Sequence, residues 1–424
     1  MSGDTYIFFS DIHIGMNTSV NWYQQSVHEP YVLAALSYVQ GLGKDVEDLV
    51  ILGDMVDQWT VLPSDQPPSV YDIYQANPNV FLGSEGSPGA LVECLSSING
   101  RVCYVNGNHD MFVTAQDVNA IRDKEGNFMH YFLSGAYSIP GTQGGVYALH
   151  GNQFSMLCAP DPWNDPPSTG HHGGLPLGHY VTRLSAQWAY NELKNTEKYP
   201  PGSTVANMPN TGYPTGWYVD MEGLEEILLT IITDILEGKS VELSQIILNA
   251  LNDIAGFGSG NTSFSMFPNY GTNGSIDLNT AISTYGSLFT QWDDRYGFWH
   301  ALSALKDADI EDKLAPFAAN INQMPGLNNQ VVIMGHTHKP LEDPSNSSQD
   351  YIYANSGFNC PSIPDMQNSG KCPTFVQVTV NSTEYVVSVM KVGPAPDYSV
   401  TMVSQDSINI SSGETVLQGK CSCC

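Results

Sequence analysis

The sequence predicts a layered α/β protein that carries its chemistry at the ends of strands. Three observations favour this class. Short apolar runs alternate with helical patterns in the first part of the chain, a series of strands follows near its end, and five of the apolar runs end in Asp, Asn or His. Such runs are typical of buried strands, and their alternation with helices is typical of α/β folds. Because open α/β sheets bind ligands beyond the carboxyl ends of their strands, the five runs predict one functional site.

The first 158 residues alternate between strands and helices. The expected elements are strand 6–11, helix 31–41, strand 49–54, helix 90–98, strand 101–105, a short helix within 115–134 and strand 146–150. Between Trp59 and Gly89 we expect a loop rich in Pro, Ser and Asp. Four more strands are expected later, at 331–335, 351–354, 375–380 and 385–391. We therefore expect a core of residues 1–158 and 325–395, followed by a C-terminal extension, 396–424.

Residues 159–324 form a large, mostly helical insertion in this core. It opens with a loop rich in Gly, Pro and His, and helical patterns follow at 180–194, 224–236, 241–254, 280–292 and 299–305. The insertion leaves and rejoins the chain between two groups of candidate ligands, so its ends are expected beside the site. This favours a cap that shapes a substrate pocket. The alternative is a peripheral helical decoration.

The chain is strongly acidic. Of its 424 residues, 15 are Lys or Arg and 43 are Asp or Glu, which gives a formal net charge of -28. Such a surface repels phosphate backbones, so nucleic acid is disfavoured as a partner. No segment approaches the roughly 20 apolar residues of a membrane-spanning helix. Residues 1–4 lead into the first strand without a signal-peptide pattern, which favours a cytoplasmic location.

The eight cysteines are too sparse for a disulfide framework in a chain of this length. Cys94, Cys103 and Cys158 fall in or near expected core elements and are predicted to be buried thiols. The C-terminal sequence Cys421-Ser422-Cys423-Cys424 is predicted to be an exposed, flexible end with reactive thiols. A disulfide, a metal site or lipidation is the alternative for this tail.

Seven side chains at strand ends are candidate metal ligands. In an extended chain, the side chains of residues two positions apart point in the same direction. The spacing of Asp11 and His13 predicts this arrangement. His336 and His338 repeat this spacing. The other candidates each follow an expected strand, in two cases after a Gly that allows a sharp turn. The full set is Asp11, His13, Asp54, Asn108, His150, His336 and His338.

This mixture of imidazoles, carboxylates and one amide oxygen suits transition metals such as Mn, Fe or Zn, whereas an all-oxygen set would suggest Mg or Ca. Seven ligands are too many for one centre and suit two divalent ions that share a bridging carboxylate. Two ions held close together can clamp the attacking and leaving oxygens of a phosphoryl displacement. They would also leave the pocket cationic within an acidic protein, so a small phosphorylated substrate could bind.

The strand-end motifs, taken in order, resemble those of the calcineurin-like metallophosphoesterases. The matching residues are Asp11-Ile12-His13, Gly53-Asp54-Met55-Val56-Asp57, Gly107-Asn108-His109-Asp110, His150-Gly151 and Gly335-His336-Thr337-His338. The resemblance covers residues 5–151 and 331–392 and does not extend to the insertion. It implies a four-layer αββα sandwich and a binuclear metal-dependent hydrolase. The bond cleaved would be a phosphomonoester, a phosphodiester or a pyrophosphate.

The resemblance also implies a role for each motif residue. The first metal would be held by Asp11, His13, Asp54 and His338. The second would be held by Asp54, Asn108, His150 and His336, with Asp54 bridging. A metal-bridging hydroxide would attack phosphorus, while His109 stabilises the developing charge or protonates the leaving oxygen. Asp110 could orient the His109 imidazole. Asp57 is expected to support the site rather than to bind metal.

Several residues of the insertion are weaker candidates for contact with the substrate. His171, His172 and His179 lie in or just after its glycine-rich opening and could reach a phosphate, although polar loop positions explain them equally well. Arg183 could clamp an oxyanion, with a surface ion pair as its alternative. Trp59 is expected either to line an apolar pocket or to belong to the core.

Two functions other than a hydrolase of small phosphoric esters remain open. A nuclease could use the same metal site, but the charge of the chain and the lack of a basic patch argue against it. A non-catalytic scaffold could share the fold. Such a scaffold would be expected to lose ligands or the His that follows Asn108, and both are present.

Overall fold

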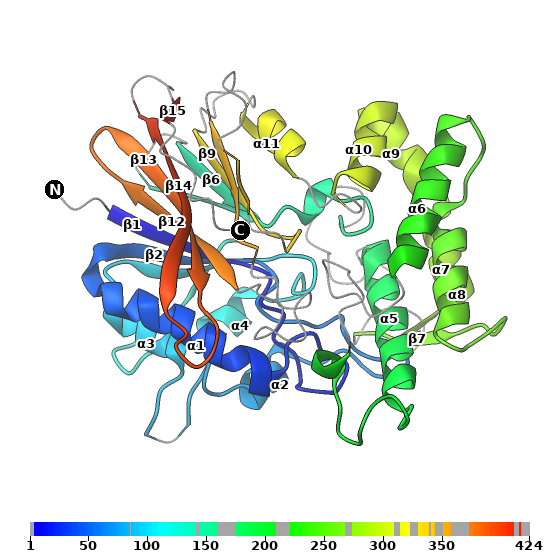
Figure 1. Cartoon of the computed structure of the whole chain (residues 1–424), viewed down its shortest axis with the longest axis horizontal. Coiled ribbons are helices and arrows are strands. Elements are labelled where there is room, and N and C mark those ends of the chain that lie inside the picture. Colours follow the sequence, from blue (N-terminus) through cyan, green and yellow to red (C-terminus); the bar gives the residue numbers. More distant parts are fainter. Residues whose placement is uncertain are drawn as a thin grey trace.

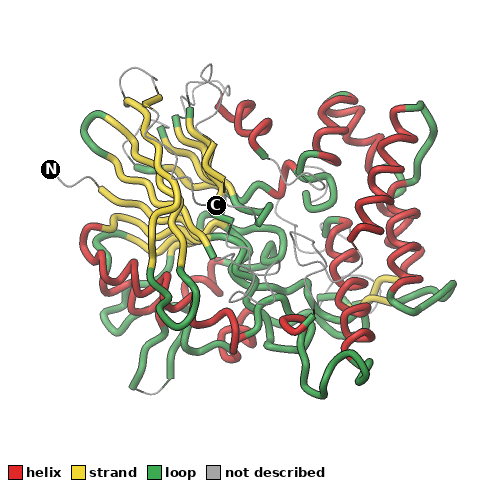
Figure 2. Tube along the Cα trace, in the orientation of Figure 1, coloured by secondary structure: helices red, strands yellow, loops and turns green. Residues whose placement is uncertain are grey.

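The computed structural model describes the chain in segments. These are residues 4–84, 86–140, 145–159, 175–208, 221–267, 274–308, 314–322, 330–338, 341–343, 351–357, 373–410 and 415–416. Within them the protein combines two main β-sheets with helices, so the predicted α/β class is confirmed (Figure 1). Figure 2 shows the strands of the two main sheets on one side of the molecule and most of the helices of the insertion on the other.

The larger sheet has eight strands and is mixed. Its order is β15-β14-β13-β12-β1-β2-β3-β4. Strands β1 to β4 run parallel to one another, and β12 to β15 continue the sheet in antiparallel fashion from β1. The bounds are β1 Asp4–Phe9, β2 Val46–Leu52, β3 Arg101–Val105, β4 His130–Tyr131, β12 Thr374–Val380, β13 Glu384–Val392, β14 Val400–Asn409 and β15 Thr415–Val416. The carboxyl ends of β1, β2 and β3 therefore meet at one edge.

The smaller sheet has five strands in the order β10-β11-β9-β6-β5. Its three central strands, β6, β9 and β11, are parallel. The bounds are β5 Ala136–Ser138, β6 Val146–Leu149, β9 Val331–Met334, β10 Leu341–Asp343 and β11 Ile352–Asn355. Because β6 and β9 are direct neighbours, the chain leaves for the insertion and returns from it at adjacent positions.

The two sheets pack against each other through an apolar cluster. Alternate residues of β1 show how the larger sheet is buried on both faces. Tyr6 and Phe8 enter the cluster shared with Val146 and Ala148 of the smaller sheet. Ile7 and Phe9 instead join the cluster under the helices α1 and α3. The larger sheet therefore lies between these helices and the smaller sheet.

Four helices accompany the larger sheet: α1 Gln25–Leu42, α2 Val70–Ala76, α3 Ala90–Ser97 and α4 Ala115–Asn119. Helix α2 lies in the segment that was expected to be entirely loop. Its first turn is closed by a capping box, in which Ser69 and Asp72 bond each other's backbone N–H groups. This local hydrogen bonding explains a short helix in a segment rich in Pro and Ser.

The described residues of the insertion contain seven α-helices, of which the first six are α5 Leu177–Leu193, α6 Met221–Leu236, α7 Leu243–Ile254, α8 Leu278–Tyr285, α9 Leu288–Tyr296 and α10 Phe298–Lys306. The insertion also contains a short hairpin, β7 Ser263–Ser265 with β8 Ser275–Asp277. The single helix expected at 280–292 is wrong, because the chain breaks at Gly286 and Ser287 into α8 and α9. Helix α11, Ala315–Asn322, belongs to the predicted insertion but lies beside β9 (Figure 1).

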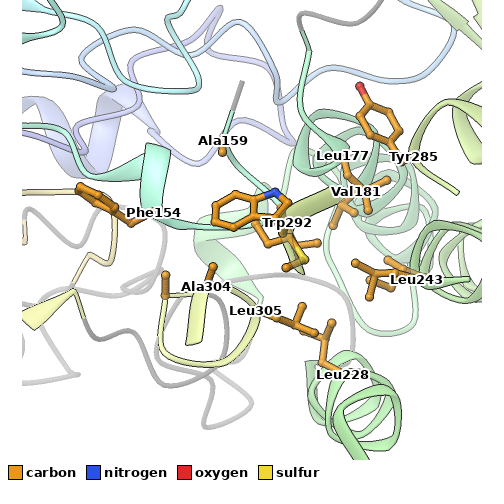
Figure 3. Close-up of a cluster of buried hydrophobic side chains, with 14 of the residues drawn as sticks. Phe154, Ala159, Leu177, Val181, Leu228, Leu243, Tyr285, Trp292, Ala304 and Leu305 are labelled. Atoms are coloured by element: carbon orange, nitrogen blue, oxygen red, sulfur yellow. The ribbon is translucent and has the colours of Figure 1, made fainter. Parts of the chain in front are cut away.

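One apolar cluster joins the insertion to the outer face of the smaller sheet. Trp292 is almost completely buried in it, close to Leu305 and Val181 (Figure 3). The same cluster includes Val332 and Met334 of β9. The burial of these apolar side chains stabilises the packing of the insertion against the core. Among the described residues, no helix is both long and apolar enough to cross a membrane.

The C-terminal extension begins with a strand that was not expected. Strand β14 pairs with β13 along most of its length. Only Asp406, Ser407 and Ile408 are buried in it, so its sequence lacks the apolar run of a central strand. The tail Cys421-Ser422-Cys423-Cys424 lies outside the described residues.

Candidate metal centre

All seven predicted ligands lie just beyond strand ends, at the edge where the two sheets meet. The larger sheet contributes the residues that follow β1, β2 and β3, and the smaller sheet contributes those that follow β6 and β9. Backbone hydrogen bonds connect these segments. The amide of His13 donates to the Asp54 carbonyl at 2.8 Å, and the amide of Gly335 donates to the His150 carbonyl at 2.9 Å. The structure therefore brings the five motifs together.

Asp54 occupies the middle of this group. Its Oδ2 lies 3.8 Å from Nε2 of His13 and 3.2 Å from Nε2 of His150. Its Oδ1 accepts a hydrogen bond of 2.8 Å from the backbone amide of His109. One carboxylate oxygen thus faces imidazoles from both sheets, which is the position that a bridging ligand requires.

A second set of donor atoms surrounds Asp11. Nε2 of His13 and Nε2 of His338 are 3.1 Å apart, and Oδ1 of Asp11 lies 3.7 Å from the latter. The backbone amide of His336 and the hydroxyl of Ser10 also donate to the Asp11 carboxylate. Asp11, His13 and His338 are close enough to hold one ion.

The third set lies around His150. Its Nδ1 donates to the Leu52 carbonyl at 2.8 Å, so Nε2 is the nitrogen that faces the other donor atoms. Oδ1 of Asn108 lies 3.2 Å from that Nε2 and 3.1 Å from Nδ1 of His336. Asp54 and His150, with Asp11, form another group close enough to hold an ion.

The charges of the site fit divalent cations. Asp11 and Asp54 are almost completely buried, and within the described part of the chain neither forms an ion pair with Lys or Arg. Buried carboxylates require a compensating positive charge. Together with the imidazole and amide donors, they provide ligands suited to Mn, Fe or Zn rather than to Mg or Ca.

The backbone of the site is strained at the ligands themselves. Five of the seven candidates have left-handed backbone conformations, with φ of 59° at Asp11, 57° at His13, 52° at Asp54, 70° at His336 and 57° at His338. Such conformations are uncommon in residues other than Gly and cluster at functional sites. They turn each side chain toward the shared edge immediately after its strand ends.

Two motif glycines allow this close approach. A Cβ atom at Gly53 would lie 2.6 Å from Nδ1 of His150, and Gly53 also has a left-handed φ of 84°. A Cβ atom at Gly107 would collide with the Asp54 carboxylate. Any larger residue at either position would push apart the side chains of the site.

Burial and the neighbouring charges set the protonation of the ligands. Burial raises the pKa of Asp11 to about 6. Burial also acts to raise the pKa of Asp54, but the charges of His150 and His109 outweigh it and hold this pKa below its usual range. Burial lowers the pKa of His338 to about 3 and that of His13 well below its ordinary value. Asp54 is thus kept ionised and these imidazoles neutral, which are the forms that bind metal.

His109 stands beside the ligands and is held by a different carboxylate from the one expected. Its Nδ1 donates to Oδ1 of Asp57 at 2.9 Å, which leaves Nε2 as the nitrogen that can face a ligand. Asp57 is itself fixed by the backbone amides of Trp59 and Thr60. Burial acts to lower the pKa of His109, but Asp57 and Asp54 raise it above its ordinary value. The protonated form of His109 is therefore more stable than that of an ordinary exposed imidazole.

The structure corrects the expected role of Asp110. Its carboxylate accepts hydrogen bonds from the backbone amides of Gly107 at 2.6 Å and Met55 at 3.1 Å, and from the Tyr104 hydroxyl at 2.6 Å. Asp110 therefore ties together the loops after β2 and β3 and does not orient His109. Burial raises the pKa of Asp110 to about 7. Asp57 provides the support that was assigned to Asp110.

Both roles expected for Arg183 are wrong, because this residue neither lies at the surface nor presents its terminal nitrogens to an oxyanion. It is completely buried on α5. Its two terminal nitrogens donate to the backbone carbonyls of Leu62, Pro63, Asp65 and Ser265. These bonds tie the loop after β2 to the insertion. His171 and His172, the other predicted substrate contacts, lie outside the described residues.

Two tryptophans flank His109, and one of them was missed. The Trp59 ring lies 4.5 Å from the His109 ring at an angle of 31°, so it is part of the wall of the site as well as of the core. Trp22 lies 4.9 Å from His109 and 4.8 Å from His13. Trp22 follows the first motif in a segment without a periodic apolar pattern. Only its nearness in sequence to His13 could have indicated that it lies at the site.

Comparison with known proteins does not assign this site. No model of a known protein family matches the chain, and no curated protein matches its sequence. The function is therefore inferred from the geometry and chemistry of the site.

Proposed function

We propose that this protein is a binuclear metal-dependent hydrolase of phosphoric esters with the αββα sandwich of the calcineurin-like metallophosphoesterases. The position of Asp54 carries the proposal, because its Oδ2 lies within 3.8 Å of His13 and 3.2 Å of His150. These imidazoles come from the two different ligand sets. The order of the motifs and the layered arrangement of two sheets between helices support the same family.

The residues present fit two divalent ions of the Mn, Fe or Zn type. One would be held by Asp11, His13, Asp54 and His338, and the other by Asp54, Asn108, His150 and His336. When bound, such ions activate water and neutralise the oxygens of a phosphoryl group.

The other residues of the site are suited to transfer a proton and to exclude water. Asp57 holds Nδ1 of His109 and raises its pKa, so Nε2 can donate a proton to the leaving oxygen while the P–O bond breaks. The rings of Trp22 and Trp59 cover His109 on two sides. A covered imidazole interacts more strongly with a developing negative charge than one in water.

The direct test is metal analysis together with turnover. We expect the full chain to bind about two equivalents of Mn, Fe or Zn and to hydrolyse p-nitrophenyl phosphate, its bis ester or both. Removal of metal by a chelator should abolish turnover, and metal addition should restore it. If protein containing two equivalents of metal hydrolysed neither ester, the proposal would be contradicted.

A further inference from the structure

The carboxyl end of β11 lies beside the metal centre, next to the motifs that follow β1 and β9. Strand β11 runs parallel to β9, so its last residue, Asn355, is placed beside the loop that carries His336 and His338. Nδ2 of Asn355 donates to the Gly335 carbonyl of this loop at 2.7 Å. The next residue, Ser356, is completely buried. A sixth strand end thus adjoins the centre without contributing a candidate ligand.

Ser356 reaches the Asp11 carboxylate through two hydroxyl groups in series. Oγ of Ser356 is hydrogen-bonded to Oγ of Ser10, and Ser10 in turn donates to Oδ2 of Asp11. An ionised carboxylate can only accept, and each hydroxyl has one proton to donate. Because Ser10 gives its proton to Asp11, Ser356 is the donor in the bond between the two hydroxyls. Ser356 and Ser10, called here the hydroxyl pair, therefore direct both of their protons toward Asp11.

These hydrogen bonds decide which oxygen of Asp11 faces the imidazoles. Oδ2 accepts the Ser10 hydroxyl, whereas Oδ1 lies 3.7 Å from Nε2 of His338 and 3.9 Å from Nε2 of His150. The backbone amide of His336 donates to the same carboxylate, at 2.8 Å to Oδ1 and 3.1 Å to Oδ2. The terminal torsion of an Asp side chain has only weak preferences of its own. Its orientation therefore depends on the groups that hydrogen-bond it.

Both sheets fix the far end of the hydroxyl pair. The amide of Ser356 donates to the Met334 carbonyl of β9 at 3.0 Å. Its carbonyl accepts a hydrogen bond of 2.7 Å from Oγ1 of Thr374, the first residue of β12. Both side chains of the pair are completely buried, and a Cβ atom at Gly335 would collide with Ser10. The pair therefore has a fixed position and does not exchange its bonds with solvent.

We propose that Ser356 is a positioning residue of the metal centre, which acts through Ser10 to hold Oδ1 of Asp11 toward the imidazoles. The inference rests on the proposed function, because it concerns the ion that Asp11, His13 and His338 would hold. Groups that hydrogen-bond a ligand orient it, and their loss typically weakens metal binding by about tenfold to a hundredfold. Ser356 thus sets the affinity of one of the two ions.

The test measures the binding of Mn²⁺ and of Zn²⁺ to the metal-free full chain by isothermal titration calorimetry. We expect Ser10→Ala to weaken the binding of one ion about thirtyfold and Ser356→Ala about tenfold, while the affinity for the other ion changes by less than about threefold. The matched control is Ser244→Ala, which removes an equally buried hydroxyl that donates to the Ile282 carbonyl of the insertion. It should bind both ions as the wild type does. If Ser356→Ala did not fold, Ser356→Cys, which keeps a side chain of similar size but donates only weakly, takes its place.

A double variant distinguishes action through Ser10 from general support of the fold. Because Ser356 acts through Ser10, Ser10→Ala combined with Ser356→Ala should bind the affected ion no more weakly than Ser10→Ala alone. Additive losses, equal weakening of both ions, or wild-type affinity in Ser356→Ala would overturn the inference and leave the proposed function in place. A wild type that binds neither Mn²⁺ nor Zn²⁺ would contradict the proposed function, and the inference with it.

Discussion

The metal centre and the wall supplied by α5 adjoin each other, but they are built in different ways. At the metal centre polar atoms face one another at short range, as Asp54 faces His13 and His150, and strained backbone directs the side chains. On α5, His179 and Thr182 are buried without partners among the described residues, while Arg183 donates to four backbone carbonyls and apolar residues pack in the cluster of the insertion. The strand ends thus bring polar side chains together, whereas α5 mainly connects the insertion to the core.

The two regions are coupled through loops of the core. Arg183 binds the loop after β2, and Trp59 and Thr60 in the same loop fix Asp57. Elsewhere the backbone amide of Val205 donates to the Ser19 carbonyl, and Trp22 packs with Ala186 and Ala189 of α5. These contacts favour the interpretation that the insertion is a cap rather than a peripheral helical decoration.

The most severe test of the metal centre is Asp54→Ala. The change removes the carboxylate that lies between the two ligand sets, so the variant should lose bound metal. Hydrolysis of p-nitrophenyl phosphate should fall at least about a thousandfold, because metal ions supply several kcal/mol of transition-state stabilisation. Elemental analysis checks the metal content. The exposed Asp72→Asn serves as the control, and wild-type metal content in Asp54→Ala would exclude the bridging role.

His109→Ala should separate proton transfer from metal binding. We expect both metals to remain and the rate to fall about a hundredfold, a typical contribution of a positioned acid. The loss should be greater for phenyl phosphate than for p-nitrophenyl phosphate, because the poorer leaving group depends more on the proton. Steady-state kinetics on both esters measures the difference. An equal loss on both esters would argue against protonation of the leaving oxygen.

Arg183→Met tests the junction between core and insertion. The substitution keeps a long side chain but removes the donors to four backbone carbonyls that are buried or partly buried. The loss of these hydrogen bonds should lower the free energy of unfolding by about 2 kcal/mol. Urea denaturation provides the measurement. As a control, Lys239→Met breaks only ion pairs of an exposed lysine. It should change the free energy of unfolding by no more than about 0.5 kcal/mol.

Asp57→Asn should lower the rate of hydrolysis less than His109→Ala does. It weakens the hydrogen bond to Nδ1 of His109 while leaving the metal ligands in place. Loss of an orienting carboxylate should cost about tenfold in rate. Turnover of p-nitrophenyl phosphate at matched metal content checks this. A rate equal to that of the wild type would show that Asp57 does not position His109.

Thiol reactivity gives the mildest comparison of the two regions. Burial raises the pKa of Cys94 to about 12, so at pH 8 this core thiol has a much smaller thiolate fraction than an ordinary cysteine. Cys158, the last residue of the core before the insertion, is only partly buried. Iodoacetamide should therefore modify Cys158 before Cys94, as mass spectrometry of the native protein would show. The reverse order would mean that the core opens more readily around Cys94 than where it adjoins the insertion.

Elements with an apolar run were predictable, and elements that depend on side-chain hydrogen bonds or that lack an apolar run were not. Strand β3 was predicted at Arg101–Val105 from the apolar run of residues 102–105, and these four residues are buried in the structure. Helix α2 was missed because it depends on the capping box of Ser69 and Asp72 rather than on a periodic apolar face. Strand β14 was missed because only three of its ten residues are buried, so it lacks the apolar run of a central strand.

The partners of the site residues could be predicted only in part. Glycines and strand ends marked the ligands, because a buried strand followed by a tight turn leaves a local signature. The partner of His109 left no such signature. Asp110 is its neighbour in sequence, yet Asp57, from the loop after another strand, reaches its ring. Contacts between loops depend on how the strands are placed side by side.

The sequence by itself determined the α/β class, the identity of the seven candidate ligands and the position of each at the end of an apolar run. Only the tertiary structure decided that these runs belong to two sheets, with β1, β2 and β3 in one and β6 and β9 in the other. An apolar run specifies that a strand is buried, but it does not specify which neighbours bury it. Packing of Phe8 against the side chains of the opposite sheet joins the two edges, and this joining turns separate motifs into one site.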